Sequence, residues 1–129
     1  MRWASEKASA KLRDHIISQH ERIEVISGKC RFNYRCQMNA VHEAVISGED
    51  KIAMAIYFDG TPIIHFLNVD AEGNYTDNTL GIWSSRYTYY LIDLIDKDEF
   101  FNVNHHFGEY RKLLRRKLGW LRLFTDMTC

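Results

Sequence analysis

Three residues of this sequence have the types and the order that nucleophilic catalysis needs: Cys36, His65 and Asp77. In such a site a cysteine thiolate attacks a carbonyl carbon, a histidine carries the proton, and a carboxylate fixes the tautomer of that histidine. Cys36 stands just before apolar residues that recur with helical spacing. We therefore expect it at a helix N-terminus, where the helix dipole and the free N–H groups lower the pKa of a thiol. The set predicts a Cys-His-Asp triad for acyl chemistry.

The spacing of His65 and Asp77 predicts how the two side chains meet. If the three-residue Ala-Glu-Gly loop joins two strands as a hairpin, Val69 pairs with Tyr75. Side chains alternate across a strand, so His65 and Asp77 then lie diagonally on one face of the hairpin, close enough to touch. A register shift of one residue would reverse the faces and make Asn78 the partner of the histidine. Both alternatives stay open on the sequence alone.

The cysteines and histidines also have other interpretations. Cys36 suits a small buried residue of a core helix, and a histidine on an apolar strand suits a hydrogen-bonded core residue. Cys30 is the nucleophile instead if the helix begins earlier. A Cys30–Cys36 disulfide is a further alternative, although three cysteines fit reduced thiols better. Cys30, Cys36, His42 and His65 are zinc-type ligands, but the C-x5-C spacing lacks a short knuckle, so we expect no metal.

Periodicity indicates an α+β chain in which helices precede and follow a run of strands. Helical patterns cover residues 4–19, 36–47, 87–95 and 110–121, and extended patterns cover residues 23–26, 51–58, 62–70 and 74–79. With one proline and no linker or repeat, the 129 residues are expected to form one domain, residues 1–129. We predict helices packed on a small antiparallel sheet of about three strands.

Three stretches carry a resemblance to known enzymes: RCQMNA, PIIHFLNVD and GNYTDNTLG. A cysteine that opens a helix, a strand with His-Phe, and an Asp-Asn-Thr segment resemble the papain-like cysteine fold of the transglutaminase-like and NlpC/P60-like kinds. The Asn-Ala pair after the cysteine and the His-Phe-x-Asn segment also resemble small bacteriophage proteins. The resemblance implies a papain-like core with Cys36 as nucleophile, His65 as base and acid, and Asp77 as orienting group. It implies a protease, amidase, deamidase or transglutaminase-like reaction on a peptide or protein substrate, without a cofactor.

Charge and hydropathy limit the expected partners and location. The 17 basic and 17 acidic residues balance, so the whole chain gives no reason to expect nucleic acid. No apolar run approaches the roughly 20 residues that cross a bilayer, and we expect a cytoplasmic protein without membrane contact. The stretch YRKLLRRKLGWLRL is the one charge-patterned segment. It indicates a solvated helix face or, in a non-catalytic alternative, a contact surface for a host protein or nucleic acid, with Trp120 available for stacking.

Overall fold

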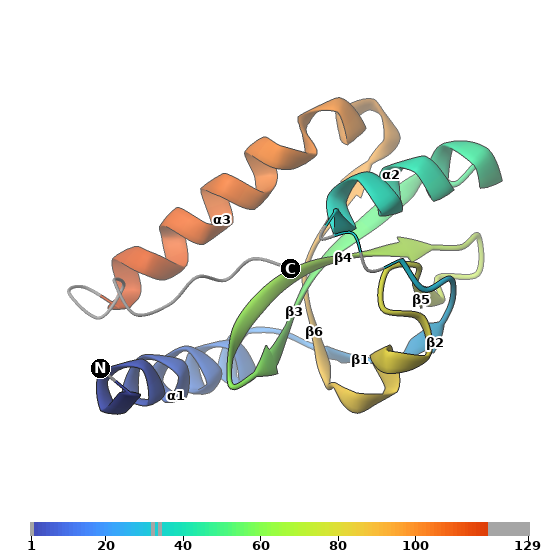
Figure 1. The fold of residues 1–129 in the computed structure, drawn as a ribbon. Coiled ribbons are helices and arrows are strands. Elements are labelled where there is room, and N and C mark those ends of the chain that lie inside the picture. Colours follow the sequence, from blue (N-terminus) through green and yellow to red (C-terminus); the bar gives the residue numbers. More distant parts are fainter. Residues whose placement is uncertain (1, 32, 34, 119–129) are drawn as a thin grey trace.

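The computed structural model describes residues 2–31, 33 and 35–118. The elements are, in chain order, α1 (Arg2–Gln19), β1 (Arg22–Ile23), β2 (Val25–Ser27), α2 (Cys36–Ser47), β3 (Lys51–Asp59), β4 (Thr61–Val69), β5 (Tyr75–Asp77), η1 (Gly81–Arg86), β6 (Tyr89–Asp96), η2 (Lys97–Asn102) and α3 (Val103–Leu118). Figure 1 shows α2 lying across β4, with the η1 turn on the opposite side of the strands. Of the helices in these ranges, none combines the length and the apolar character needed to span a membrane.

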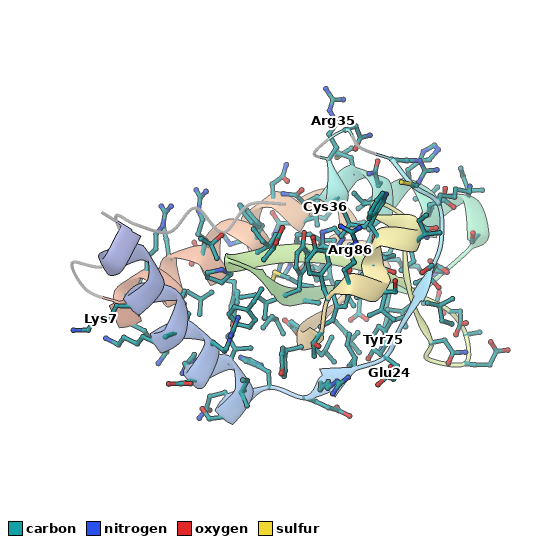
Figure 2. The ribbon with its side chains drawn as sticks, turned by 60° about the horizontal axis from the view of Figure 1, so that its bottom comes forward. Lys7, Glu24, Arg35, Cys36, Tyr75 and Arg86 are labelled. Atoms are coloured by element: carbon teal, nitrogen blue, oxygen red, sulfur yellow. The ribbon has the colours of Figure 1, made fainter. Side chains whose placement is uncertain are left out.

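The six strands form one mixed sheet in the order β1-β6-β3-β4-β5-β2. Strands β3 and β4 form an antiparallel hairpin whose turn needs the positive φ of Gly60, whereas β2 runs parallel to β5. The two edges of the sheet are β1 and β2, and only Glu24, labelled in Figure 2, separates these strands in the chain. One residue spans about 3.5 Å, so the two edges must approach each other. The sheet therefore curls into a nearly closed barrel.

Alternation along the strands gives the sheet two buried faces. Even-numbered residues of β4, such as Ile64 and Phe66, pack with Cys36 and with other side chains from the helices. Odd-numbered residues of β3, such as Ala55, pack on the other face with Tyr89 of β6. This second face is the interior of the barrel, and its small alanines leave room for the larger polar rings that enter it.

The prediction of a small three-stranded sheet with a papain-like core is wrong. The three predicted strands are present as β3, β4 and β5, but they are only half of a six-stranded sheet. The helical pattern predicted over residues 87–95 is also wrong, because Tyr89–Asp96 is strand β6. A bulge opposite Met54 and Ala55 breaks the alternation of this strand. Its apolar residues therefore fall at helix-like intervals although the backbone is extended.

Candidate functional site

His65 and Asp77 meet inside the barrel. Val69 pairs with Tyr75, which confirms the predicted register of the β4–β5 hairpin. His65 Nε2 lies 2.9 Å from Asp77 Oδ2, so the predicted contact between the two side chains is present. The side chain of Asn78 bonds to other groups, on the segment before α2 and on β4. The histidine therefore takes the aspartate and not the asparagine as its partner.

Tyr89 completes a three-residue cluster that the sequence did not reveal. Its hydroxyl donates to Asp77 Oδ2 at 2.7 Å, while Asp77 Oδ1 accepts the backbone N–H groups of Thr79 and Leu80 at 2.9 and 2.8 Å. Burial alone would raise the pKa of Asp77. The hydrogen bond and attraction of His65, together with the two backbone N–H groups, outweigh burial and hold this pKa below its usual value. Four donors thus surround one carboxylate, and they tie β4, β5 and β6 together.

The His65–Asp77–Tyr89 cluster is closed to solvent. The relative exposures of its members are 0%, 0% and 1%. The His65 ring meets the ring of Tyr57 edge-on, with the centroids 5.3 Å apart, and its Nδ1 has no hydrogen-bond partner among the described residues. Asp77 only accepts, so Nε2 is the nitrogen that donates. A general base must come within hydrogen-bond distance of its substrate, and this buried ring offers no surface for that contact.

Cys36 lies on the other side of the sheet from His65. It begins α2, as predicted (Figure 2). Its side chain has no exposed surface. It packs in the same cluster as Ile64 and Phe66, the two neighbours of His65 in β4, whereas the His65 ring contacts Tyr57 on the interior face. The Cys36 sulfur is also held in a disulfide. The structure thus brings together two of the three predicted residues and not the third, and the catalytic role of the triad stays a prediction.

The structure also shows where Cys30, the alternative nucleophile, lies and whether the zinc-type ligands come together. Cys30 is exposed and has a free thiol, and its backbone pairs with that of Leu80 in an isolated bridge. Over the described ranges, no three His, Cys, Asp or Glu side chains are grouped so that they could hold a metal ion. The zinc-type set of Cys30, Cys36, His42 and His65 is therefore not assembled.

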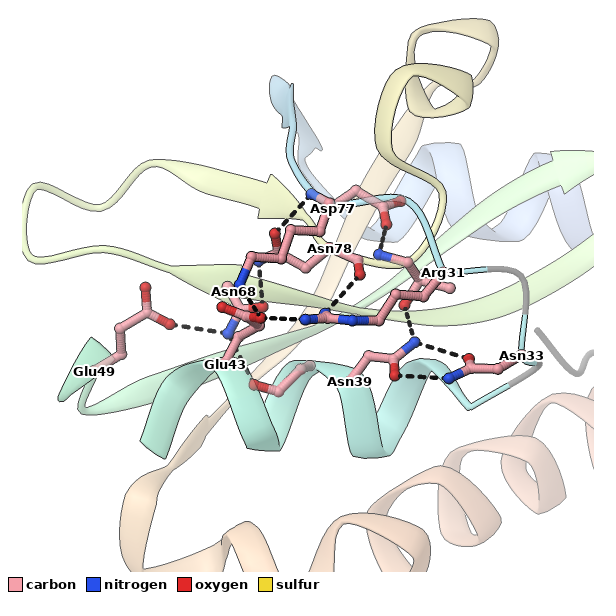
Figure 3. A network of polar contacts seen from close by, with 11 residues as sticks. Arg31, Asn33, Asn39, Glu43, Glu49, Asn68, Asp77 and Asn78 are labelled. Atoms are coloured by element: carbon pink, nitrogen blue, oxygen red, sulfur yellow. Dashed lines mark hydrogen bonds and ion pairs between the residues drawn. The ribbon is translucent and has the colours of Figure 1, made fainter. Parts of the chain in front are cut away.

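A second polar network fastens α2 to the segment that precedes it (Figure 3). Lys29 Nζ donates to Glu43 Oε1 at 2.7 Å, and Arg31 Nη2 donates to the same oxygen. The hydrogen bonds from Lys29 and Arg31 hold the pKa of Glu43 below its usual value in spite of burial. Arg31 Nη1 also donates to the backbone carbonyl of Asn78 at 3.1 Å. Arg31 thus links Glu43 of α2 to the backbone that follows β5.

An arginine-lined pocket lies between α1, the end of η1 and the start of β6. It encloses about 310 Å³, and its lining includes Arg13, Phe58, Arg86, Tyr87, Thr88 and Tyr90. We call it the Arg13–Arg86 pocket. Both arginines are exposed, and neither forms an ion pair with a carboxylate of the described residues. Instead, Arg13 Cζ lies 5.0 Å from the ring centroid of Phe58, and Arg86 Cζ lies 4.0 Å from that of Trp83.

A larger cavity of about 550 Å³ lies near the opposite end of β3, and its lining includes Glu49, Asp50 and Asp70. These three carboxylates already have partners. Glu49 accepts a side-chain amide, Asp50 pairs with a lysine, and Asp70 accepts backbone N–H groups of its own turn. The Arg13–Arg86 pocket differs because its charged groups lack counterions in the described part of the chain.

The described part of the basic stretch near the C-terminus, residues 110–118, forms the second half of α3. Lys112, Arg116 and Lys117 are exposed, and Leu114 is fully buried. Trp120 and Arg122, which belong to the same stretch, lie outside the described residues. The described part of α3 therefore has the form of a packed amphipathic helix with a solvated basic face.

Comparisons with protein-family models, with curated proteins and with solved structures find no match to this chain. The resemblance to papain-like cysteine enzymes receives no support from them.

Proposed function

We propose that this chain is a binding protein for anionic ligands and that the Arg13–Arg86 pocket is its site. The observation that carries the proposal is that two exposed guanidinium groups line one pocket without an ion-pair partner among the described residues. A guanidinium presents its N–H donors in a planar fork that matches the oxygens of phosphate or carboxylate. An anion between the two arginines would use donors that the protein leaves available.

Aromatic rings hold both arginines in place. Arg13, on α1, lies over the ring of Phe58, and Arg86, at the end of η1, lies over the ring of Trp83. Contact with a ring face restrains a guanidinium while its N–H edge stays accessible. Restraint of this kind lowers the conformational entropy lost when a ligand binds. These contacts support a site that is organised before the anion arrives.

The binding proposal is preferred to cysteine-dependent acyl chemistry for a geometric reason. The hydrolase hypothesis needs Cys36 and His65 on one face with access to a substrate. In the described fold these residues lie on opposite faces of the sheet, and both are fully buried. The hydrolase hypothesis would need a different arrangement of α2 and the sheet, whereas anion binding uses the pocket as it stands.

The test is a titration of the purified chain with inorganic pyrophosphate, followed by isothermal calorimetry at low ionic strength. We expect saturable binding that weakens with added salt, because the contact is between exposed charges. The double variant Arg13→Gln, Arg86→Gln should bind at least about tenfold more weakly, since hydrogen bonds to charged groups contribute roughly 1.5–3 kcal/mol each.

The matched control replaces two other exposed arginines, Arg35→Gln and Arg116→Gln. Arg35 precedes α2 and Arg116 lies on α3, and neither residue lines the pocket, so the control removes the same two charges outside the site. We expect its affinity for pyrophosphate to stay within about twofold of the wild type. Absence of saturable binding to the wild type, or an equal loss in the control and in the double variant, would contradict the proposal.

A further inference from the structure

The Arg13–Arg86 pocket also contains an aromatic platform, which narrows the chemistry of its ligand. The ring of Tyr87 stacks on Tyr57, with the centroids 4.4 Å apart and the planes inclined by 29°. Its hydroxyl donates to Asp59 Oδ2 at 3.2 Å. Burial, followed by the charge of Asp59, raises the pKa of Tyr87, so the hydroxyl stays a donor at neutral pH. A ring fixed by stacking at one face and by a hydrogen bond at its tip is a rigid surface.

Two further aromatic residues form the wall of the pocket. Phe58 and Tyr90 meet edge to face, with their centroids 6.4 Å apart, and both are partly buried against the helix-covered side of the sheet. Thr88 is exposed at the same pocket and supplies a hydroxyl. Cations, ring faces and a hydroxyl thus line one cavity. A bare anion such as phosphate would use only the cations.

We infer that the ligand is a nucleoside phosphate, either free or as the end of a single-stranded nucleic acid. This inference rests on the proposed function, because it places the phosphate at Arg13 and Arg86. The base stacks on the face of Tyr87 that is turned away from Tyr57, and the sugar lies near Thr88. The cavity of about 310 Å³ is at the lower end of the size range of small-molecule sites, which suits one nucleotide unit.

The alternatives fit the lining less well. An acidic peptide would satisfy the guanidinium groups but would make no use of the stacking surface. A neutral aromatic ligand would use the rings and leave both guanidinium groups without an anion. A nucleotide unit uses both sets of groups, since base–aromatic stacking tolerates any base and phosphate matches the guanidinium fork.

The experiment compares four probes on the wild-type chain by calorimetry: adenosine 5′-monophosphate, ribose 5-phosphate, adenosine and pyrophosphate. Stacking of one base predicts that adenosine 5′-monophosphate binds about tenfold or more tightly than ribose 5-phosphate. Equal affinities for these two probes would overturn the inference and leave anion binding intact. Failure of all the phosphate-bearing probes to bind would overturn the inference and the proposed function together.

A variant and its control locate the base. Tyr87→Leu should lower the affinity for adenosine 5′-monophosphate about tenfold and leave the affinity for pyrophosphate within about twofold of the wild type. Tyr75→Leu, at a partly exposed tyrosine outside the pocket, should change neither. A 5′-phosphorylated hexa-adenylate then identifies the source. Tighter binding than the mononucleotide supports a nucleic-acid end, and equal binding supports a free nucleotide. An unchanged affinity of a folded Tyr87→Leu variant for adenosine 5′-monophosphate would overturn the inference.

Discussion

Tyr89→Phe tests whether the His65–Asp77–Tyr89 cluster stabilises the barrel. The change removes one hydroxyl, which donates to Asp77 Oδ2 at 2.7 Å, and keeps the ring that packs in the interior. A hydrogen bond to a charged group contributes roughly 1.5–3 kcal/mol to stability. The three other donors to Asp77 remain, so we expect the free energy of unfolding to fall by about 2 kcal/mol at pH 7. Urea unfolding followed by circular dichroism measures the difference.

The pH dependence of this cost is a second, independent readout. The folded-state pKa of Asp77 is lowered, so the stability that its carboxylate contributes is present above the ordinary pKa of 3.8 and is lost as the pH falls through the folded value. Without the Tyr89 hydroxyl the folded pKa is depressed less, because one donor to the anion is gone. The difference between wild type and variant should therefore shrink as the pH is lowered from 7 toward 3.

Tyr75→Phe is the control for this prediction. The Tyr75 hydroxyl makes no hydrogen bond to another described residue, and the side chain is partly exposed, so we expect a change within about 0.5 kcal/mol. A cost of Tyr89→Phe below about 0.5 kcal/mol would refute the argument. So would a larger cost that stays constant down to pH 3, because packing rather than the carboxylate would then be its source.

Two further predictions concern backbone packing and the cysteines. Gly28→Ala should lower the free energy of unfolding by about 1–3 kcal/mol, because the added methyl group overlaps the Asn78 side chain. Gly108→Ala should raise this free energy by about 0.5–1 kcal/mol, because Gly108 lies in a helix with open space around it. Urea unfolding measures both changes. In the folded chain under reducing conditions, Cys30 should react with iodoacetamide and Cys36 should react only after unfolding, as followed by mass spectrometry. Rapid modification of Cys36 in the native state would revive the hydrolase hypothesis.

Local patterns predicted the β4–β5 hairpin correctly. A three-residue loop between two extended segments fixes the register, and the register fixes the faces, so the contact of His65 with Asp77 followed from spacing alone. The start of α2 at Cys36 followed in the same way from the apolar spacing. These features depend on residues that are close in the sequence, where periodicity and turn chemistry carry the information.

The sequence did not predict the closure of the barrel. An extended segment was predicted over residues 23–26, where β1 and β2 lie. These strands have only two and three residues, which is too short for a pattern that would show them to be the two edges of one sheet. Because of the bulge, the apolar residues of β6 have helical spacing. This spacing predicts a helix and so does not place Tyr89 beside Asp77. The Arg13–Arg86 pocket is lined by residues of α1, η1 and β6. Because α1 is far from the other two elements in the sequence, these residues meet only in the folded chain.

The position of α2 separates the predicted nucleophile from the histidine–aspartate pair. A carboxylate that fixes a histidine serves a nucleophile only if the nucleophile reaches the same face of the sheet. Here α2 covers the face of the sheet formed by Ile64 and Phe66, the two neighbours of His65 in β4. Neighbouring residues of a strand point to opposite faces, so the His65 ring lies on the interior face. The wall of the barrel therefore separates Cys36 from the His65–Asp77 pair. On the interior face, the same hydrogen bond instead joins strands whose buried polar groups need partners. The spacing in the sequence determined that His65 and Asp77 would form a hydrogen bond. Only the packing of α2 determined that Cys36 would lie on the other face of the sheet.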